Sequence, residues 1–169
     1  MEEFLPLDPI NLSMILGWCH DWPADQWPII SRAPVPPHIR AVTNPPYVGP
    51  IRMSAVDNWE WNALVLYAEP TVDHLMKNFP DCEWKKPWLS ACFPGFGVDF
   101  HEDAQPDNFV TRIHCPIITN PQARINVNGS IYHPKVGMSY KMDTRVRHGV
   151  KNDGKQIRTH FIFDVMRKE

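Results

Sequence analysis

Residues 110–133, VTRIHCPIITNPQARINVNGSIYH, predict three short β-strands joined by tight turns. The first segment, 110–118, is rich in β-branched residues, which favour strands. The other two segments, 124–127 and 130–133, flank Asn128–Gly129. An Asn-Gly pair between two such segments is a strong signal for a β-hairpin, because both residues tolerate the positive φ that a type I′ turn requires. The middle of the chain is therefore expected to form antiparallel β-structure.

The sequence on both sides continues this pattern of short strands and turns. Further strands are predicted over residues 88–93, 97–101, 137–142, 145–150 and 157–165. Pro-Gly at 94–95 and Asn-Asp-Gly at 152–154 predict turns between them. Short strands in this number, separated by tight turns, favour a β-sandwich or barrel.

The first 87 residues have a different composition from the rest. The chain has 18 prolines, concentrated before residue 95, and all seven tryptophans lie between residues 18 and 88. Each proline fixes φ and removes an amide donor, so this region is expected to form loops and short helices. Helices are predicted over Asp8–Gly17 and over Thr71–Phe79, with Pro70 just before the second. Residues 57–67 fit either a strand or a helix.

The bulk properties exclude several classes of protein. A length of 169 residues suits one domain, with residues 1–87 flanking a β-rich core over 88–169. A net charge of −2 gives no sign of nucleic-acid binding, and no segment approaches the roughly 18 apolar residues of a membrane span. The four cysteines form no CxxC pair, and the acidic start lacks a signal-peptide pattern. We therefore expect a cytoplasmic protein.

His101, Asp103 and His148 are the candidate metal ligands. Two imidazoles and a carboxylate can occupy one face of an iron(II) ion and leave the other positions open, as in non-heme iron oxygenases. A His-x-Asp pair alone arises about once by chance in a chain of this composition, and its alternative explanation is a solvated loop. The pair gains weight because it ends a predicted strand and a second histidine follows 45 residues later.

Three further residues suggest a site for an organic anion. Arg158 follows His148 by ten residues, where its guanidinium could hold the far carboxylate of an organic acid. Arg112 and His114 share one face of the predicted strand 110–118, and such a pair inside a barrel needs an anion or a polar network. The alternatives are a surface arginine at 158 and an outward-facing pair at 112 and 114. His160, on the same face as Arg158, could support this site.

Residues 90–165 resemble the aspartyl/asparaginyl β-hydroxylase family, including its small bacterial proline-hydroxylase-like members. The matching segments are FPG (93–95), HED (101–103), RIHCPIITNP (112–121), NG (128–129), HGVKN (148–152) and RTHFIFDV (158–165). They follow the same order as in the family, along a stretch that spans close to half of the chain. The animal aspartyl hydroxylases have a glycine where this chain has Asp103, so the chain is more similar to the branch with a complete metal triad.

The resemblance implies a mainly β fold, a double-stranded β-helix (jelly-roll, cupin-like), preceded here by the Pro/Trp-rich N-terminal region. It implies iron(II), 2-oxoglutarate and O2 as cofactor and cosubstrates, with His101, Asp103 and His148 as metal ligands. Arg158 would bind the distal carboxylate of 2-oxoglutarate together with the hydroxyl group of Ser90. The two remaining site residues, Arg112 and His114, would lie near the metal-chelating end of 2-oxoglutarate.

The function expected from these residues is hydroxylation of an amino acid, or of an amino-acid side chain in a peptide, with release of succinate and CO2. One alternative is a cupin-like protein that binds a metal or an organic acid without oxidising it. Another is a cupin isomerase or lyase that uses neither oxygen nor an oxo acid. Arg158 distinguishes these readings, because only the oxygenase needs a cation beside the metal to hold the oxo acid. The sequence indicates neither the substrate nor the oligomeric state.

Overall fold

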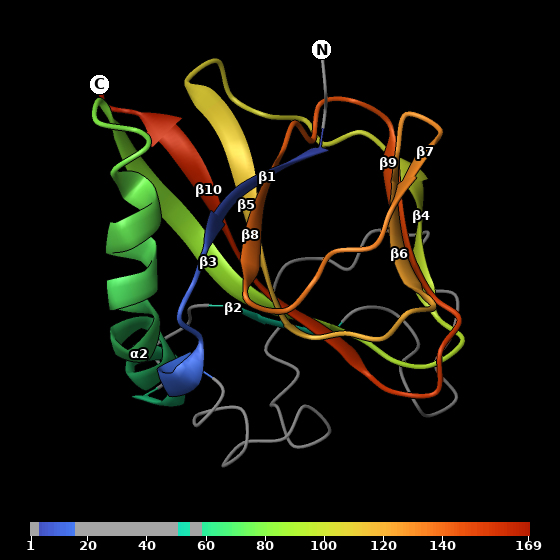
Figure 1. The fold of residues 1–169 in the computed structure, drawn as a ribbon. Coiled ribbons are helices and arrows are strands. Elements are labelled where there is room, and N and C mark those ends of the chain that lie inside the picture. Colours follow the sequence, from blue (N-terminus) through green and yellow to red (C-terminus); the bar gives the residue numbers. More distant parts are fainter. Residues whose placement is uncertain (1–3, 16–50, 55–58) are drawn as a thin grey trace.

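The structure is a computed structural model that describes residues 4–15, 51–54 and 59–169 (Figure 1). Its elements are β1 (Phe4–Pro9), β2 (Ile51–Ser54), α2 (Trp59–Met76), β3 (Cys82–Cys92), β4 (Gly97–His101), β5 (Phe109–Ile118), β6 (Ala123–Val127), β7 (Ser130–Tyr132), β8 (Met138–Met142), β9 (His148–Asn152) and β10 (Arg158–Arg167).

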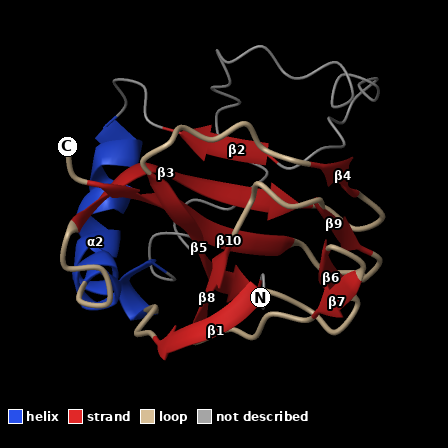
Figure 2. Cartoon of the chain, turned by 90° about the horizontal axis from the view of Figure 1, so that it is seen from above, coloured by secondary structure: helices blue, strands red, loops and turns tan. Residues whose placement is uncertain are grey.

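Two antiparallel sheets face each other and enclose the interior of the fold (Figures 1 and 2). The larger sheet has the order β1-β8-β5-β10-β3-β2 and the smaller one has the order β4-β9-β6-β7. Consecutive strands such as β4 and β5 lie in different sheets, which is the arrangement of a double-stranded β-helix. The expected fold class is therefore confirmed.

Strand β10 lies between β3 and β5 in the larger sheet and is buried on both faces. On its outer face, Phe161 and Phe163 belong to the main hydrophobic cluster together with Val72 and Leu75 of α2. The helix covers this face in Figure 2. Burying one such aromatic side chain contributes about 1.5–3 kcal/mol. The opposite, inner face of β10 carries polar groups. Packing on the outer face therefore stabilises the strand, and the side chains of the inner face are available for a functional site.

A smaller hydrophobic cluster lies between the two sheets. It contains Phe4 of β1, Met142 of β8, and Ile125 and Val127 of β6. The ring of Phe4 stacks on Tyr140, with centroids 5.1 Å apart. This cluster joins the N-terminal strand to both sheets.

The helix predictions need correction at their boundaries. Asp8 and Pro9 end strand β1, and helical residues begin only at Ser13, so the helix predicted from Asp8 starts too early. Pairing with β8 holds this segment extended, and Ser139 exchanges two hydrogen bonds with the backbone of Asp8. Residues 16–17 of that prediction lie outside the described part of the chain.

Residues 71–76 of the second predicted helix, Thr71–Phe79, form the C-terminal part of the longer helix α2, which ends at Met76, three residues before the predicted end. Pro70 lies inside α2 rather than before it, and residues 59–67, left open between strand and helix, are helical. A proline inside a helix costs about 3 kcal/mol. The burial of Ala68, Val72 and Leu75 against the sheet offsets this cost.

The strand predictions are confirmed in number and order from residue 88 onward, with shifted ends at several strands. Strand β3 begins at Cys82 instead of Trp88, and β9 begins at His148 instead of Arg145. Residues 143–147 form a turn in which the carboxylate of Asp143 accepts hydrogen bonds from the backbone and guanidinium of Arg145. Strands β1 and β2 were not predicted. Within the described residues, no helix is both long and apolar enough to span a membrane.

Candidate metal centre

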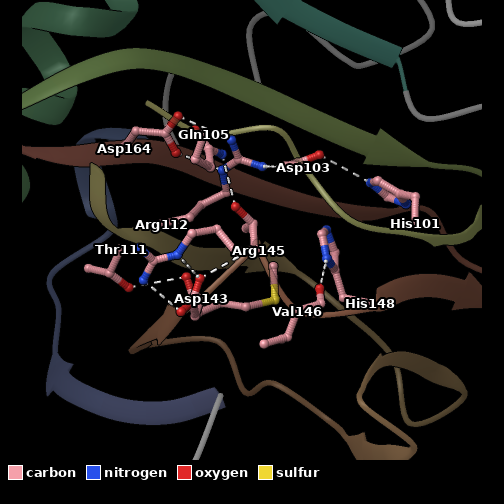
Figure 3. A network of polar contacts seen from close by, with 12 residues as sticks. His101, Asp103, Gln105, Thr111, Arg112, Asp143, Arg145, Val146, His148 and Asp164 are labelled. Atoms are coloured by element: carbon pink, nitrogen blue, oxygen red, sulfur yellow. Dashed lines mark hydrogen bonds and ion pairs between the residues drawn. The ribbon is translucent and has the colours of Figure 1, made fainter. Parts of the chain in front are cut away.

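His101, Asp103 and His148 converge at one end of the smaller sheet, although 47 positions separate the first from the last (Figure 3). His101 ends β4 and lies directly opposite His148, the first residue of β9. Their ring centroids are 4.4 Å apart. One ligand atom from each of the three residues lies within 4.8 Å of the others. These three predicted ligands therefore form a cluster that could hold a metal ion.

Backbone carbonyl groups orient both imidazole rings. Nδ1 of His101 lies 2.8 Å from the carbonyl oxygen of Asp99, and Nδ1 of His148 lies 2.9 Å from that of Val146. A carbonyl oxygen can only accept, so each Nδ1 carries a proton and donates it. In the neutral ring the lone pair is then on Nε2, the tautomer that a metal ligand needs.

Asp103 is held in the loop after β4 by Thr144. The backbone NH of Asp103 donates to the carbonyl oxygen of Thr144 over 2.9 Å, and Gln105 donates to the hydroxyl of the same threonine over 2.9 Å. Thr144 is fully buried. This anchoring brings the carboxylate of Asp103 toward His101, with 3.4 Å between its Oδ1 and Nε2 of the ring. A metal ion bound here would replace any proton shared between these two atoms.

The carboxyl group of Asp103 is ionised. Burial by itself raises its pKa, but the hydrogen bond with His101 and the positive charge of Arg112 outweigh burial and hold the pKa well below its usual range. For His148 the pKa is lowered, first by burial and also by the charge of His101. The cluster thus offers a carboxylate and a neutral imidazole at physiological pH, which are the forms that bind a divalent cation.

Arg112 on β5 links Asp103 to a second buried carboxylate, that of Asp164 on β10. Its Nη1 donates to Oδ2 of Asp103, while Nε and Nη2 donate to the two oxygens of Asp164 over 2.7 and 3.1 Å. The guanidinium also lies over the ring of Trp88, 4.7 Å from the centroid. Arg112 therefore faces the interior, as expected, and contacts a candidate metal ligand. Figure 3 shows this chain from Asp164 through Arg112 to Asp103 and His101.

A second polar cluster on the larger sheet contains Arg158, His160 and His114. Arg158 is 3% exposed, so the alternative of a surface arginine is wrong. Its Nη2 donates to Nδ1 of His160 over 2.7 Å, and that atom is 3.5 Å from Nδ1 of His114. Ser90 lies directly across from His160 in the pairing of β3 with β10, so their side chains share a face.

The positive charge of Arg158 has no carboxylate partner among the residues that the structure describes. Burial lowers the pKa of this arginine to about 10. A buried cation is costly unless an anion compensates it. The interior of the barrel at Arg158 is therefore suited to a ligand that carries a negative charge.

Two imidazole nitrogens beside Arg158 are buried and have no hydrogen-bond partner in the described part of the protein. They are Nε2 of His114 and Nε2 of His160. Burial, followed by the charge of Arg158, lowers the pKa of both histidines well below its usual value, so both are neutral. A buried polar atom without a partner costs about 1–3 kcal/mol. Arg158, with an imidazole N–H beside it, fits an anion with several oxygen atoms.

The structure brings the seven predicted site residues into two adjoining groups. His101, Asp103 and His148 form one, and Arg158, His114 and Ser90 line the other. Arg112 lies against the first group and has His114 two positions further along the same strand. The sequence reasoning missed the roles of Asp164 and Thr144. Asp164 could have been found from its alternation with Arg158 and His160 along 157–165, which predicts that it points inward.

Comparison with known proteins adds a family and a set of similar folds. Residues 51–168 match the family model described as Aspartyl/Asparaginyl beta-hydroxylase. No curated protein sequence matches this chain.

Solved structures with a similar fold include oxygenases of known class. A prolyl-4-hydroxylase from Pseudomonas putida aligns with 99% of this chain and 94% of its own, at 13% identity and a TM-score of 0.61. AviO1 from Streptomyces viridochromogenes Tue57 aligns with 97% of this chain and 89% of its own, at 13% identity and a TM-score of 0.70. An oxidoreductase of the 2OG-Fe(II) oxygenase family from Burkholderia pseudomallei covers 70% and 68%, at 12% identity and a TM-score of 0.55. At these identities the likeness establishes a shared fold.

Proposed function

This chain belongs to the aspartyl/asparaginyl β-hydroxylase family of iron(II)- and 2-oxoglutarate-dependent oxygenases, and we propose that it hydroxylates an amino acid or an amino-acid side chain in a peptide. The proposed reaction consumes 2-oxoglutarate and O2 and releases succinate and CO2. The single observation that carries this proposal is the convergence of His101, Asp103 and His148 within 4.8 Å, in a chain of this family.

Iron(II) would be held by Nε2 of His101, Nε2 of His148 and the carboxylate of Asp103. Two neutral imidazoles and one carboxylate on one side of the ion leave positions for a chelating oxo acid and for oxygen. When bound, the iron supplies the oxygen chemistry, and the protein supplies binding, orientation and exclusion of water. The backbone bonds at Nδ1 of both histidines fix the orientation of the rings before the metal arrives.

Arg158 would bind the distal carboxylate of 2-oxoglutarate. Its buried guanidinium has no carboxylate partner among the described residues, and a planar guanidinium binds a carboxylate in two places at once. Ser90 lies across from His160 on the same face and could add a hydroxyl hydrogen bond. His114, whose Nδ1 lies 3.5 Å from Nδ1 of His160, would help to hold His160 in place beside Arg158.

Arg112 and Asp164 would act through Asp103. Three hydrogen bonds from Arg112 reach the two carboxylates, so the guanidinium fixes the position of the metal-ligand oxygen atoms. This differs from a direct role of Arg112 at the chelating end of 2-oxoglutarate, because these donors are already bonded to the protein. A charged neighbour on the ligand carboxylate, itself held by a second carboxylate, provides the outer-shell support that metal sites require.

An amino acid or a peptide is the substrate class that the comparisons favour. The family is named for hydroxylases of aspartyl and asparaginyl residues, and one protein of similar fold is a prolyl-4-hydroxylase. The net charge of −2 gives no support to a nucleic-acid substrate. A cupin isomerase or lyase leaves the buried Arg158 without an explanation, and a protein that only binds an organic acid is distinguished by succinate formation in the test below.

The test begins with anaerobic protein, iron(II) and 2-oxoglutarate. We expect a weak visible charge-transfer band that is lost in His101→Ala. Admission of oxygen, with a panel of amino acids and short peptides, should then yield succinate and a product heavier by about one oxygen atom. A band without succinate formation in the presence of every substrate class would favour a binding protein. Absence of the charge-transfer band in the wild-type protein would contradict the proposed oxygenase function.

A further inference from the structure

His160 is held in a single protonation form by Arg158. The guanidinium of arginine has only donors, so Nδ1 of His160, 2.7 Å from Nη2, must accept that hydrogen bond. Nδ1 therefore carries no proton in the neutral ring, and the proton lies on Nε2. This tautomer is the opposite of that of His101 and His148, whose Nδ1 atoms donate to backbone carbonyl oxygens.

The Nε2–H group of His160 has no acceptor among the described residues. His160 is 0% exposed, so bulk water does not satisfy it. The ring lies on the inner face of β10, on the same side as Arg158 and opposite Ser90 on β3. A buried donor beside a buried cation without a carboxylate would be satisfied by an acceptor on a bound molecule.

We propose that His160 is a positioning residue for the oxo acid. Its Nδ1 orients the Arg158 guanidinium toward the distal carboxylate, and its Nε2–H, on the opposite edge of the ring, donates to a separate acceptor in the occupied site. The proposal rests on the proposed function, because it takes the ligand of Arg158 to be 2-oxoglutarate. His160 makes the site selective for a dicarboxylic oxo acid over a monocarboxylic one.

The arrangement favours a neutral histidine at this position over a charged one. A protonated imidazole would place a proton on Nδ1, facing the guanidinium donor, and would bring two positive charges together in a buried site. A neutral imidazole accepts from the arginine with one nitrogen and still donates with the other. Among the side chains that do both, glutamine is a close replacement because its long amide side chain has an acceptor and two donors.

The test compares two ligands and three variants. 2-Oxoglutarate and 2-oxopentanoate have the same chain length, and the second has a methyl group where the first has its distal carboxylate. Binding is measured anaerobically with the iron(II)-loaded protein, from the charge-transfer band and by calorimetry. The variants are His160→Leu, His160→Gln and a control, Thr159→Val, which alters the adjacent buried residue on the outer face of β10.

We expect His160→Leu to weaken 2-oxoglutarate binding by about tenfold and to leave 2-oxopentanoate within about twofold of the wild type. His160→Gln should stay within about threefold for both acids, and Thr159→Val should change neither. The KM for 2-oxoglutarate should rise in the leucine variant more than kcat falls. Equal weakening of both acids would mean a purely structural role and would overturn the proposal, as would unchanged binding of 2-oxoglutarate.

A direct measurement of the tautomer makes the proposal testable even if His160→Leu does not fold. Long-range 1H–15N spectra of the wild-type protein should show His160 with its proton on Nε2, and the Nε2–H signal should shift on addition of 2-oxoglutarate. A proton on Nδ1 would contradict the proposal.

The variant Arg158→Leu distinguishes a failure of this proposal from a failure of the proposed function. If it leaves 2-oxoglutarate binding unchanged, the proposed cosubstrate site is wrong. If it abolishes binding while His160→Leu has no effect, only the role of His160 fails.

Discussion

Asp164 and Arg112 lie directly opposite each other on β10 and β5 and form a two-point ion pair, with Nε–Oδ1 at 2.7 Å and Nη2–Oδ2 at 3.1 Å. Asp164 is 1% exposed. The same guanidinium holds Asp103, so a residue at the centre of the larger sheet determines the position of a candidate metal ligand on the loop after β4. The two sheets thus cooperate in one metal site.

Replacing Asp164 should weaken metal binding without removing a ligand. In Asp164→Asn the side chain keeps its shape and loses its charge, so Arg112 would draw the carboxylate of Asp103 more strongly toward itself. We expect a loss of iron(II) affinity of about tenfold, within the range seen for outer-shell residues of metal sites. Calorimetric titration with iron(II) under anaerobic conditions measures it, and Thr159→Val on the same strand serves as control. Wild-type affinity in Asp164→Asn would contradict the role of this pair.

Removing a proposed metal ligand should lower the metal affinity more than replacing a residue that only positions a ligand. His148→Ala deletes one of three ligand atoms, so its metal affinity should fall by more than about 100-fold, beyond the usual outer-shell range. A cobalt(II) titration followed by visible absorption gives the affinity and reports the coordination. His133→Ala is the control, because His133 is exposed and, within the described part of the chain, its ring bonds to the backbone carbonyl of Ala123. Equal affinities of the two variants would show that His148 is not a ligand.

Much of the fold could be predicted from the sequence because its signals are local. Asn128 and Gly129 have positive φ in the structure, as a tight hairpin between β6 and β7 requires. The limits of α2 depend on distant contacts. Pro70 has a local preference for a helix start, and the burial of Val72 and Leu75 in the main hydrophobic cluster makes the longer helix favourable.

The site could be predicted as a set of residue types, but its hydrogen bonds could not. The spacing of His101, Asp103 and His148 is visible in the sequence because strand ends place them. The link from Arg112 to Asp164 depends on the register of β5 against β10 across 52 positions, which a sequence pattern does not determine. The tautomer of His160 depends likewise on its geometry with Arg158.

The metal-free protein should lose stability as the pH falls below about 6.5. Burial, then the charge of Arg158, lowers the pKa of His114 and of His160 in the folded state, with Arg112 adding to the effect at His114. The unfolded chain therefore binds protons that the folded one excludes, and the free energy of unfolding rises with pH in this window. Each histidine contributes up to about 1.4 kcal/mol per pH unit.

Urea unfolding at pH 5.0, 5.5, 6.0 and 7.0 measures this dependence. The double variant His114→Gln/His160→Gln should lose most of the slope, and His74→Gln, at an exposed position of α2, should retain it. A double variant with the wild-type slope would mean that other groups dominate.

Asn152 should be the most sensitive polar residue outside the two site clusters. Its side chain is 0% exposed, and Nδ2 donates to the carbonyl oxygens of Cys92 and Gln156, both over 2.8 Å. Its Oδ1 accepts from the backbone NH of Gly154 over 3.1 Å. These bonds hold the turn that leads into β10 and Arg158.

Asn152→Ala leaves buried backbone groups without partners, so the free energy of unfolding should fall by about 2–3 kcal/mol. Arg158 would also lose its fixed position, and binding of 2-oxoglutarate should weaken in the folded fraction. Urea unfolding and anaerobic calorimetry measure the two effects, with Asp153→Ala as control, since Asp153 forms an exposed ion pair with Arg124. Equal stability of Asn152→Ala and Asp153→Ala would show that the buried amide does not hold this turn.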